Sequence, residues 1–311
     1  MNQAVVKPKP PYRITLHLQL FTLPGEPTPY KYDPSTRTLR VLAPLQDHPT
    51  PLVIRVEGEA WKPIITLQTP WGDPPSSEAV EWARTLLRVD YDYRLFQEAV
   101  EASGLQALQT LASKYPGLRP GRLTSLYDAL IDSIVKQRIT LRQALRIEAR
   151  LTREYGLHAR IGGETYYWYP PPQGLAAAEP EELRALGLTR LKAQALRCVA
   201  RAQLEERLPT LREAIGDPEG AAGELTRLYG VGPWTASLAV ALVHPLFPVG
   251  PATDLAVRRG IERLLGRPLS REGWTKLKHV LGDHLGLLMY LAALNYELSR
   301  SHTPRPRRKT V

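Results

Sequence analysis

Gly230 and Gly232, which flank a single valine, are the residues of this 311-residue chain best suited to hold a phosphate. They separate two helical patterns, one ending at residues 225–228 and one starting at Pro233. Glycine adopts positive φ angles and lets the backbone lie close to a ligand, and the free N–H groups at the start of the second helix favour an anion. Val231 can pack between the helices. We therefore predict a hairpin that holds a nucleic-acid phosphate without reading sequence, with a plain turn between helices as the alternative.

Asp254 is the second candidate for chemistry, because it stands just before an amphipathic helical pattern of Leu255, Val257, Ile261 and Leu264. A carboxylate in this position can cap the helix by accepting hydrogen bonds from its first N–H groups. It can also stabilise positive charge that develops at a reacting centre and orient or deprotonate a water molecule. Position alone favours the cap, so the choice depends on the surrounding motif.

The elements that position these residues differ between the two ends of the chain. Residues 13–21 alternate apolar and polar side chains, and short apolar runs follow at 38–42 and 52–56, with proline-rich breaks between them. An antiparallel sheet is expected there. After Ser76 the pattern is helical almost throughout to Ser299. Helix starts are indicated by capping-box spacings at Thr140–Gln143 and Thr210–Glu213, and by Asp217-Pro218.

The predicted fold class is α+β, with an N-terminal antiparallel β-sheet domain and flanking helix in residues 1–110. A mainly α-helical core of two subdomains follows in residues 111–299. Successive prolines exclude a helix interior at Tyr166–Pro172, so we expect a linker between the helical subdomains near residues 166–172. Residues 300–311 are expected to form a basic, disordered tail that either binds phosphate or only adds solubility.

The charge of the chain lies in its second part. Lys and Arg exceed Asp and Glu by 41 to 31, a net charge of +10, yet residues 1–110 carry 11 basic and 12 acidic side chains. The excess favours a polyanionic partner. The single cysteine, Cys198, excludes an intrachain disulfide and a CxxC metal site, and its apolar neighbours suggest an inert core position. No apolar run is long enough to span a membrane, so we expect a cytoplasmic, nucleoid-associated protein.

The stretch Leu225–Ala236, LTRLYGVGPWTA, with Phe247-Pro248 and Asp254 after it, resembles the helix-hairpin-helix-GPD (HhH-GPD) superfamily of DNA glycosylases. Within that superfamily the sequence is most similar to bacterial 3-methyladenine DNA glycosylase II. The resemblance covers roughly residues 110–298. The N-terminal domain is similar only in its type of fold. It implies a small antiparallel sheet domain followed by a two-subdomain helical glycosylase core, with a lesion pocket between the subdomains.

The resemblance gives Asp254 the position of the catalytic carboxylate, which would stabilise the oxocarbenium character of the deoxyribose. Trp234 stands where bifunctional members carry a Schiff-base lysine. Because an indole cannot form an imine, this residue favours a monofunctional enzyme. Trp234 can also stack on an extruded, positively charged base, or it can be a core residue between helices.

Two further base-pocket positions depart from the family pattern. Tyr296 aligns with a tryptophan that stacks in the pocket, and Leu238 stands where the family places a tyrosine. Tyrosine keeps an aromatic face and adds a hydroxyl group, so specificity can shift toward bases that offer a hydrogen-bond partner. The pocket is therefore expected to differ in shape from that of the family.

The loop Lys136–Thr140 corresponds to the one from which the family fills the space left by a flipped base. Gln137 matches the family's glutamine and Arg138 replaces its leucine, so either Arg138 or Ile139 can be the wedge, unless Lys136 and Arg138 are simply solvated. The predicted DNA-binding residues are Gln137, Arg138, Ile139, Gly230, Val231, Gly232 and Thr235. The resemblance also implies that carbonyl groups of residues 228–231 can coordinate a monovalent cation, and no other metal or cofactor is expected.

The sequence thus predicts a monomeric, monofunctional DNA glycosylase acting on duplex DNA with damaged bases, most readily alkylated purines. One alternative is an oxidised- or deaminated-purine glycosylase, with Lys136 or Lys192 as a displaced lyase lysine. Another is a noncatalytic helix-hairpin-helix DNA-binding protein, for which Asp254, Trp234 and Tyr296 would have no use.

Overall fold

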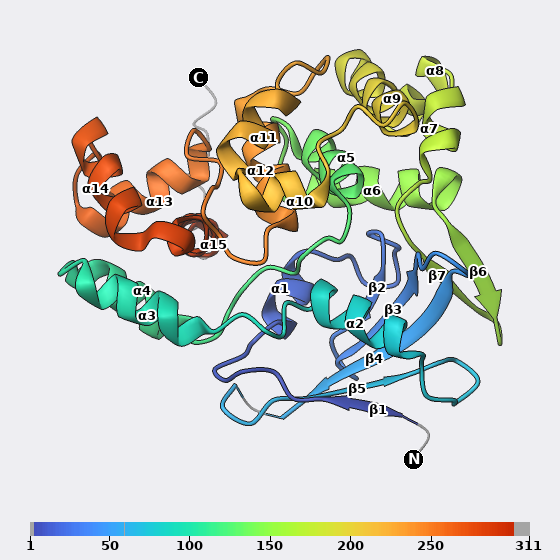
Figure 1. The fold of residues 1–311 in the computed structure, drawn as a ribbon, viewed down its shortest axis with the longest axis horizontal. Helices are drawn as coiled ribbons and strands as arrows, with labels where there is room; N and C mark the ends of the chain where they lie inside the picture. The colour runs from blue at the N-terminus through green and yellow to red at the C-terminus, as the bar shows by residue number, and fades with distance from the viewer. Residues whose placement is uncertain (1–2, 59, 302–311) are drawn as a thin grey trace, which may run out of the picture.

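A five-stranded antiparallel sheet forms the N-terminal part of the computed structural model, which describes residues 3–58 and 60–301. The strands lie in the order β1 (Ala4–Val6), β5 (Ile64–Gln68), β4 (Thr50–Glu57), β3 (Thr38–Ala43) and β2 (Lys31–Asp33). The two expected apolar runs are β3 and β4, which pair from Thr38 opposite Arg55 to Ala43 opposite Thr50. The α+β fold class is confirmed, with the helices gathered on one side of the sheet (Figure 1).

The expectation of a strand at residues 13–21 is wrong, because α1 (Thr15–Leu20) is a short helix. Its alternating leucines serve two different cores. Ile14 and Leu18, which are four residues apart, are buried in the core beneath the sheet, whereas Leu16 and Leu20 pack against the second core. A helix that buries two opposite faces therefore produces the period of a strand.

The rest of the chain is mainly helical. The helices are α2 (Ser77–Leu86), α3 (Tyr93–Ala102), α4 (Gln106–Lys114), α5 (Leu126–Lys136), α6 (Leu141–Tyr155), α7 (Pro172–Ala177), α8 (Pro180–Ala185), α9 (Arg190–Leu204), α10 (Leu211–Gly216), α11 (Pro218–Leu225), α12 (Pro233–Val243), α13 (Leu255–Leu265), α14 (Arg271–Leu281) and α15 (Leu285–Ser301). The predicted starts are confirmed: Thr140 and Thr210 form capping boxes, and Asp217 caps α11 with Pro218 at its first position.

The helical pattern is interrupted by a hairpin of β6 (His158–Ile161) and β7 (Glu164–Tyr167), which turns at Gly162 and Gly163, both with positive φ. The stretch expected to be a linker near residues 166–172 therefore begins inside a strand, and α7 begins at its last residue. The hairpin lies beside β3 of the sheet (Figure 1).

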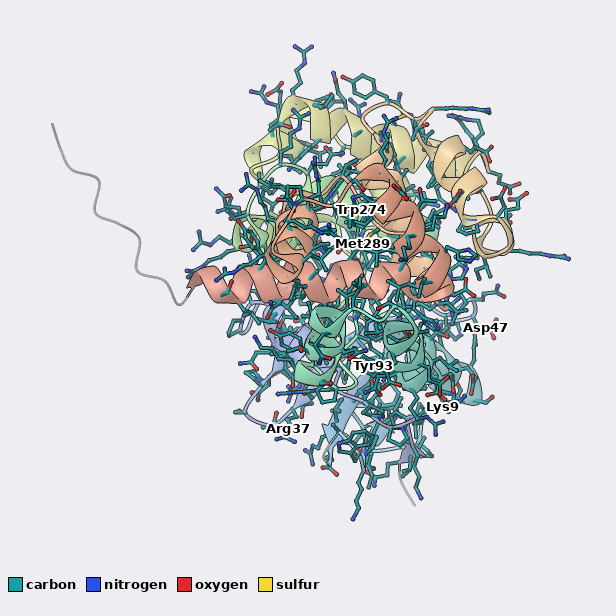
Figure 2. All side chains as sticks on the ribbon, turned by 90° about the vertical axis from the view of Figure 1, so that its left-hand side faces the viewer. Lys9, Arg37, Asp47, Tyr93, Trp274 and Met289 are labelled. Atoms are coloured by element: carbon teal, nitrogen blue, oxygen red, sulfur yellow. The ribbon has the colours of Figure 1, made fainter. Side chains whose placement is uncertain are left out.

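Two hydrophobic cores hold the fold together. The first joins the sheet to α5, α9 and α12, and the second joins α3 and α4 to α13, α14 and α15. Figure 2 shows the layers of the second core, with Tyr93 on one side of α15 and Trp274 on the other. The flanking helices of the N-terminal part thus pack against the C-terminal helices. The core position expected for Cys198 is wrong, because this residue is partly exposed on α9.

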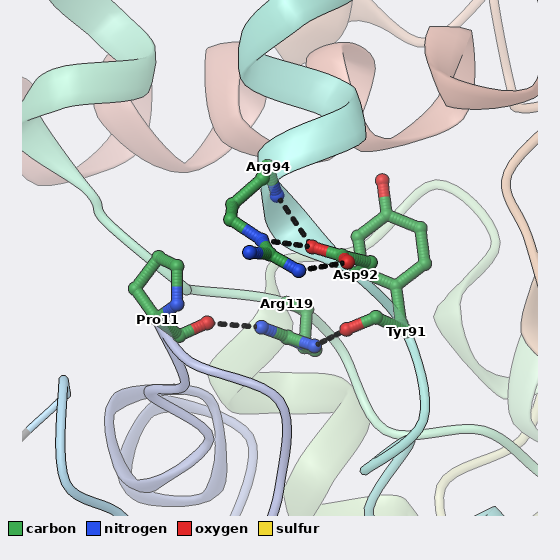
Figure 3. A network of polar contacts seen from close by, with 5 residues as sticks. All are labelled: Pro11, Tyr91, Asp92, Arg94 and Arg119. Atoms are coloured by element: carbon green, nitrogen blue, oxygen red, sulfur yellow. Dashed lines mark hydrogen bonds and ion pairs between the residues drawn. The ribbon is translucent and has the colours of Figure 1, made fainter.

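A buried arginine, Arg119, ties these layers together. It donates hydrogen bonds to the carbonyl oxygens of Pro11 and Tyr91 (Figure 3). It also donates to the carbonyl oxygen of Gly117. Close by, Asp92 caps α3 and pairs with Arg94. Burial lowers the pKa of Arg119, and the dipoles of these carbonyl groups and the neighbouring tyrosine rings stabilise its charge.

The C-terminal tail is only partly covered by the structure. Residues 300 and 301, the first two of the expected tail, are the end of α15, and residues 302–311 lie outside the described residues. Among the described helices, none combines the length and the apolar character that crossing a bilayer requires.

Candidate active site and nucleic-acid interface

The hairpin between α11 and α12 has the predicted form, but its two glycines serve different needs. Gly230 has φ of 76°, and a Cβ there would lie 2.5 Å from the Cβ of Ala195 on α9. Gly232 has an ordinary φ of −91°, caps α12 without a side-chain bond, and has nothing within 4 Å of where its Cβ would be. Only Gly230 therefore uses the positive φ that glycine allows. Gly230 fits the hairpin onto α9, and Gly232 leaves open space beside the start of α12.

The hairpin is fixed from inside by two residues of the predicted set. Val231 is 4% exposed and packs in the first core, as expected for a residue between two helices. Gln137, at the end of α5, donates its side-chain amide to the Gly230 carbonyl and to the Thr235 hydroxyl, both at 2.9 Å. Thr235 is itself buried. The Gln137 amide thus holds the hairpin and the start of α12 in place.

Arg138 and Ile139, the two candidates for the wedge, lie in different surroundings. Arg138 is exposed and has φ of 53°, an uncommon conformation for a residue with a side chain. Ile139 is only partly exposed and packs against the first core. Arg138 is therefore the residue at the tip of this loop that is free to approach a ligand.

Trp234 and Asp254 are in direct contact. The indole Nε1 of Trp234 donates to Oδ2 of Asp254 at 2.9 Å. Oδ1 of the same carboxylate accepts from the backbone N–H groups of Ala256 and Val257 at 2.8 and 3.1 Å, which caps α13. The cap and the candidate catalytic carboxylate are thus the same group. One oxygen fixes the carboxylate on the helix, and the other lies beside an aromatic ring that is itself half-buried.

The loop before Asp254 is anchored on the start of α15. The N–H of Phe247 donates to the Asp283 carbonyl at 2.7 Å, and the N–H of Gly286 donates to the Phe247 carbonyl at 2.8 Å. Gly286 is needed here, because a Cβ would lie 2.3 Å from the carbonyl oxygen of Val249. The approach of the chain to Asp254 is therefore fixed by backbone contacts.

Arg88, which lies two residues after the last residue of α2, holds the other end of this loop, a role that the sequence did not predict. It is 3% exposed, and it donates to the carbonyl groups of His244 and Pro245 at 2.6 and 3.0 Å. Its guanidinium lies 4.1 Å from the centre of the Phe247 ring. Burial lowers the pKa of Arg88. An arginine after the apolar pair of residues 86 and 87 carried no local signal of this role, because its partners are distant in the chain.

The remaining pocket candidates lie on neighbouring helices. Leu238 is half-buried on α12, one turn after Trp234. Tyr296 is half-buried on α15, which packs closely on α13, since a Cβ at Gly260 would lie 2.3 Å from the Ala292 carbonyl oxygen. The structure thus joins Trp234 to Asp254 by a hydrogen bond. Leu238 lies on the same helix as Trp234, and Tyr296 lies on α15, which packs against the helix that Asp254 caps.

The two lysines considered for lyase chemistry are engaged elsewhere. Lys136 forms ion pairs with Asp132 and Glu148; burial alone would lower its pKa, but these carboxylates raise it. Lys192 is 5% exposed and donates to the Val135 carbonyl at 2.8 Å, and burial lowers its pKa to about 8. The amines of both lysines are therefore bonded to groups other than the Trp234–Asp254 pair.

The hairpin carbonyl groups fit a cation only in part. The Leu228 carbonyl accepts from the Val231 N–H at 3.1 Å, and the Gly230 carbonyl accepts from Gln137, so each retains one lone pair for a ligand. Across residues 3–58 and 60–301, no group of three or more His, Cys, Asp or Glu side chains is placed to hold a metal ion.

The chain is similar to known DNA repair proteins. Residues 131–272 match the family described as HhH-GPD superfamily base excision DNA repair protein. The chain is 36% identical over 131 residues to DNA-3-methyladenine glycosylase 2 of Escherichia coli (strain K12), an alignment covering 42% of this chain and 45% of that protein. The chain thus spans about half the length of this relative.

Two solved structures share the fold over nearly the whole chain. A 3-methyladenine DNA-glycosylase from Archaeoglobus fulgidus has a TM-score of 0.76 at 23% identity, covering 97% of this chain and 99% of that one. An 8-oxoguanine glycosylase/lyase from Clostridium acetobutylicum has a TM-score of 0.71 at 14% identity, covering 95% and 96%. At these identities the likeness establishes the fold alone.

Proposed function

We propose that this chain, whose residues 131–272 match the HhH-GPD superfamily of base excision DNA repair proteins, is a monofunctional DNA glycosylase. It would flip a damaged base, an alkylated purine, out of duplex DNA and hydrolyse the N-glycosidic bond to leave an abasic site. The substrate class is carried over from the name of the Escherichia coli relative. The contact between Trp234 and Asp254 is the observation that supports this function best.

The reaction needs little beyond this pair. As the C1′–N bond breaks, the base leaves with the bonding electrons, which neutralise a cationic alkylpurine. The Asp254 carboxylate stabilises the positive charge that develops on the deoxyribose. A water molecule attacks C1′ and loses a proton, for which Asp254 is the acceptor. The capping bonds to Oδ1 fix the carboxylate, and the indole at Oδ2 supplies an aromatic wall for the departing base.

The hairpin and the Arg138 loop would hold the DNA. N–H groups at the start of α12, open at Gly232, suit a backbone phosphate. Arg138 would fill the space left by the flipped base, with Ile139 supporting it from the core. Gln137 acts as a positioning residue, because its amide is already bonded to the hairpin.

The proposed reaction has no step that requires a cofactor, and a monovalent cation at the Leu228 and Gly230 carbonyl groups would only strengthen the phosphate site. The protein is proposed to act as a monomer. Because its substrate would be chromosomal DNA, the protein is proposed to work in the cytoplasm, associated with the nucleoid.

The decisive experiment compares Asp254→Asn with Asp217→Asn. Both residues are aspartate N-caps, Asp217 of α11, and asparagine caps a helix equally well. We expect Asp254→Asn to release base from a methylated duplex at least about 100-fold more slowly than the wild type, a loss of about 2.7 kcal/mol. Asp217→Asn should keep the wild-type rate. Equal rates for wild type and Asp254→Asn would overturn the mechanism.

The two alternative functions predict different results. A glycosylase with lyase activity would form a covalent adduct with DNA under borohydride, which we do not expect because both candidate lysines are bonded elsewhere. A noncatalytic binding protein would bind an abasic-site analogue but release no base from alkylated, oxidised or deaminated duplexes.

A further inference from the structure

A basic cavity on α9 lies outside the proposed active site. It has a volume of about 550 Å³, and its lining includes Arg197, Arg201, Arg207, Gln194, Cys198 and Tyr229. Tyr229 belongs to the hairpin, so the cavity lies where α9 meets the loop that precedes the open N–H groups of α12. None of its residues takes part in the reaction proposed above.

The charges of this cavity are only partly compensated within the protein. Arg207 is paired with Glu205 at 2.6 Å. Arg197 and Arg201 form no ion pair with a carboxylate of the described residues. In addition, Nε of Arg197 is buried without a hydrogen-bond partner. With no carboxylate partner for two of its three arginines, the cavity carries uncompensated positive charge that favours an anionic ligand.

The cavity is built as an extension of the hairpin. The Tyr229 hydroxyl donates to Oε1 of Gln194 at 2.8 Å, and the next residue, Gly230, lies against Ala195 of the same helix. Tyr229 is 52% exposed, so its ring is available at the rim. The helix that carries the arginines, α9, is thus packed directly against the hairpin that leads into α12.

We propose that this cavity binds a second backbone phosphate of the DNA whose first phosphate is held at the start of α12. Guanidinium groups match phosphate oxygens in geometry and charge, and a contact of this kind adds affinity without reading sequence. The inference rests on DNA as the substrate of the proposed function, but not on the chemistry at Asp254.

The salt dependence of DNA binding tests the charge. Each phosphate that the protein no longer neutralises makes the negative slope of log K against log salt shallower by about 0.9. For a duplex containing an abasic-site analogue, Arg201→Gln should make this slope shallower by about that amount, and Arg197→Gln should do the same. Arg55→Gln, which removes an exposed arginine of β4, should leave the slope unchanged. An unchanged slope for both cavity variants would overturn the proposal.

The single cysteine of the chain provides a direct reporter, because Cys198 lines the cavity. We expect saturating duplex to slow alkylation of Cys198 at least about 5-fold in the wild type. The control is Ser77→Cys in a Cys198→Ser background, which carries an exposed thiol at the start of α2 and should react equally fast with and without DNA. Unprotected Cys198 at full DNA occupancy would contradict the proposal.

Other outcomes separate this inference from the proposed function. Protection of Cys198 together with no base release from any duplex would support the phosphate site and refute the glycosylase. Base release with an unprotected cysteine would do the reverse. Protection by inorganic phosphate alone, with none by duplex DNA, would show a site for a free anion and overturn the assignment to DNA.

Discussion

The indole Nε1 of Trp234 lies 2.9 Å from Oδ2 of Asp254, so the first turn of α12 is hydrogen-bonded to the residue that caps α13. The two helices meet at the point where the hairpin would present DNA. The same bond fixes an aromatic ring beside a carboxylate, which is the arrangement that a departing purine and a developing sugar cation both require. The geometry of the site therefore depends on one side-chain contact between two elements.

Removing this bond while keeping an aromatic ring should slow the reaction. In Trp234→Phe, Asp254 is deprived of one of its donors, and a hydrogen bond to a charged group contributes about 1.5–3 kcal/mol. We expect single-turnover base release to fall roughly 10- to 100-fold. Trp82→Phe is the control, since this indole donates to Thr124 outside the site. A wild-type rate for Trp234→Phe would mean that the ring alone is sufficient.

Arg88 should act on catalysis as a positioning residue. In Arg88→Met, the carbonyl groups of His244 and Pro245 are left without their donor, and we expect about 3 kcal/mol lower stability together with slower base release at saturating DNA. The affinity for an abasic-site analogue should change little, because Arg88 is buried away from the surface. Arg84→Met, which removes an ion-paired arginine of α2, should cost less than about 1 kcal/mol. Equal loss of rate and affinity would argue against positioning.

The two hairpin glycines should respond to alanine in opposite ways. Gly230→Ala places a methyl group against Ala195 at a positive φ, so we expect a loss of stability of at least about 1–3 kcal/mol in urea unfolding. Gly232→Ala has room and an ordinary φ, so stability should fall by no more than about 1 kcal/mol, the cost of alanine at an N-cap. Binding to duplex DNA should nevertheless weaken in Gly232→Ala, because the methyl group occupies the space beside the start of α12. Retained affinity would place the phosphate elsewhere.

His17 should make the fold sensitive to acid. Burial, with the nearby charges of Lys136 and Arg88, lowers its pKa to about 3, whereas in the unfolded chain it titrates near 6.5. Below pH 6.5 the unfolded chain therefore binds a proton that the folded protein does not, and stability falls as the pH decreases toward 3. Between pH 6.5 and 5.0 the wild type should lose stability more steeply than His17→Gln, by a difference that approaches about 1.4 kcal/mol per pH unit. A constant difference between the two proteins across this range would refute the shift.

Local features of the chain could be predicted from the sequence because they depend on neighbouring residues. The caps at Thr140, Thr210 and Asp217 were predictable, since a side chain three positions from a free N–H group satisfies it wherever the helix lies. The hairpin at Gly230 was predictable for the same reason. The role of Gln137 in holding this hairpin was not, because its partners are distant in the chain.

What the sequence by itself determined is therefore the starts of α6, α10 and α11 and the motif that carries Asp254. Only the tertiary structure decided that Leu16 and Leu18 face different cores, that Cys198 lines a basic cavity, and that Arg88 reaches His244 across 156 residues of chain. The physical reason is the separation along the chain between the groups that interact. Backbone groups at a helix end are satisfied by residues nearby in the chain, whereas buried charges and apolar faces are satisfied by whatever the fold brings to them.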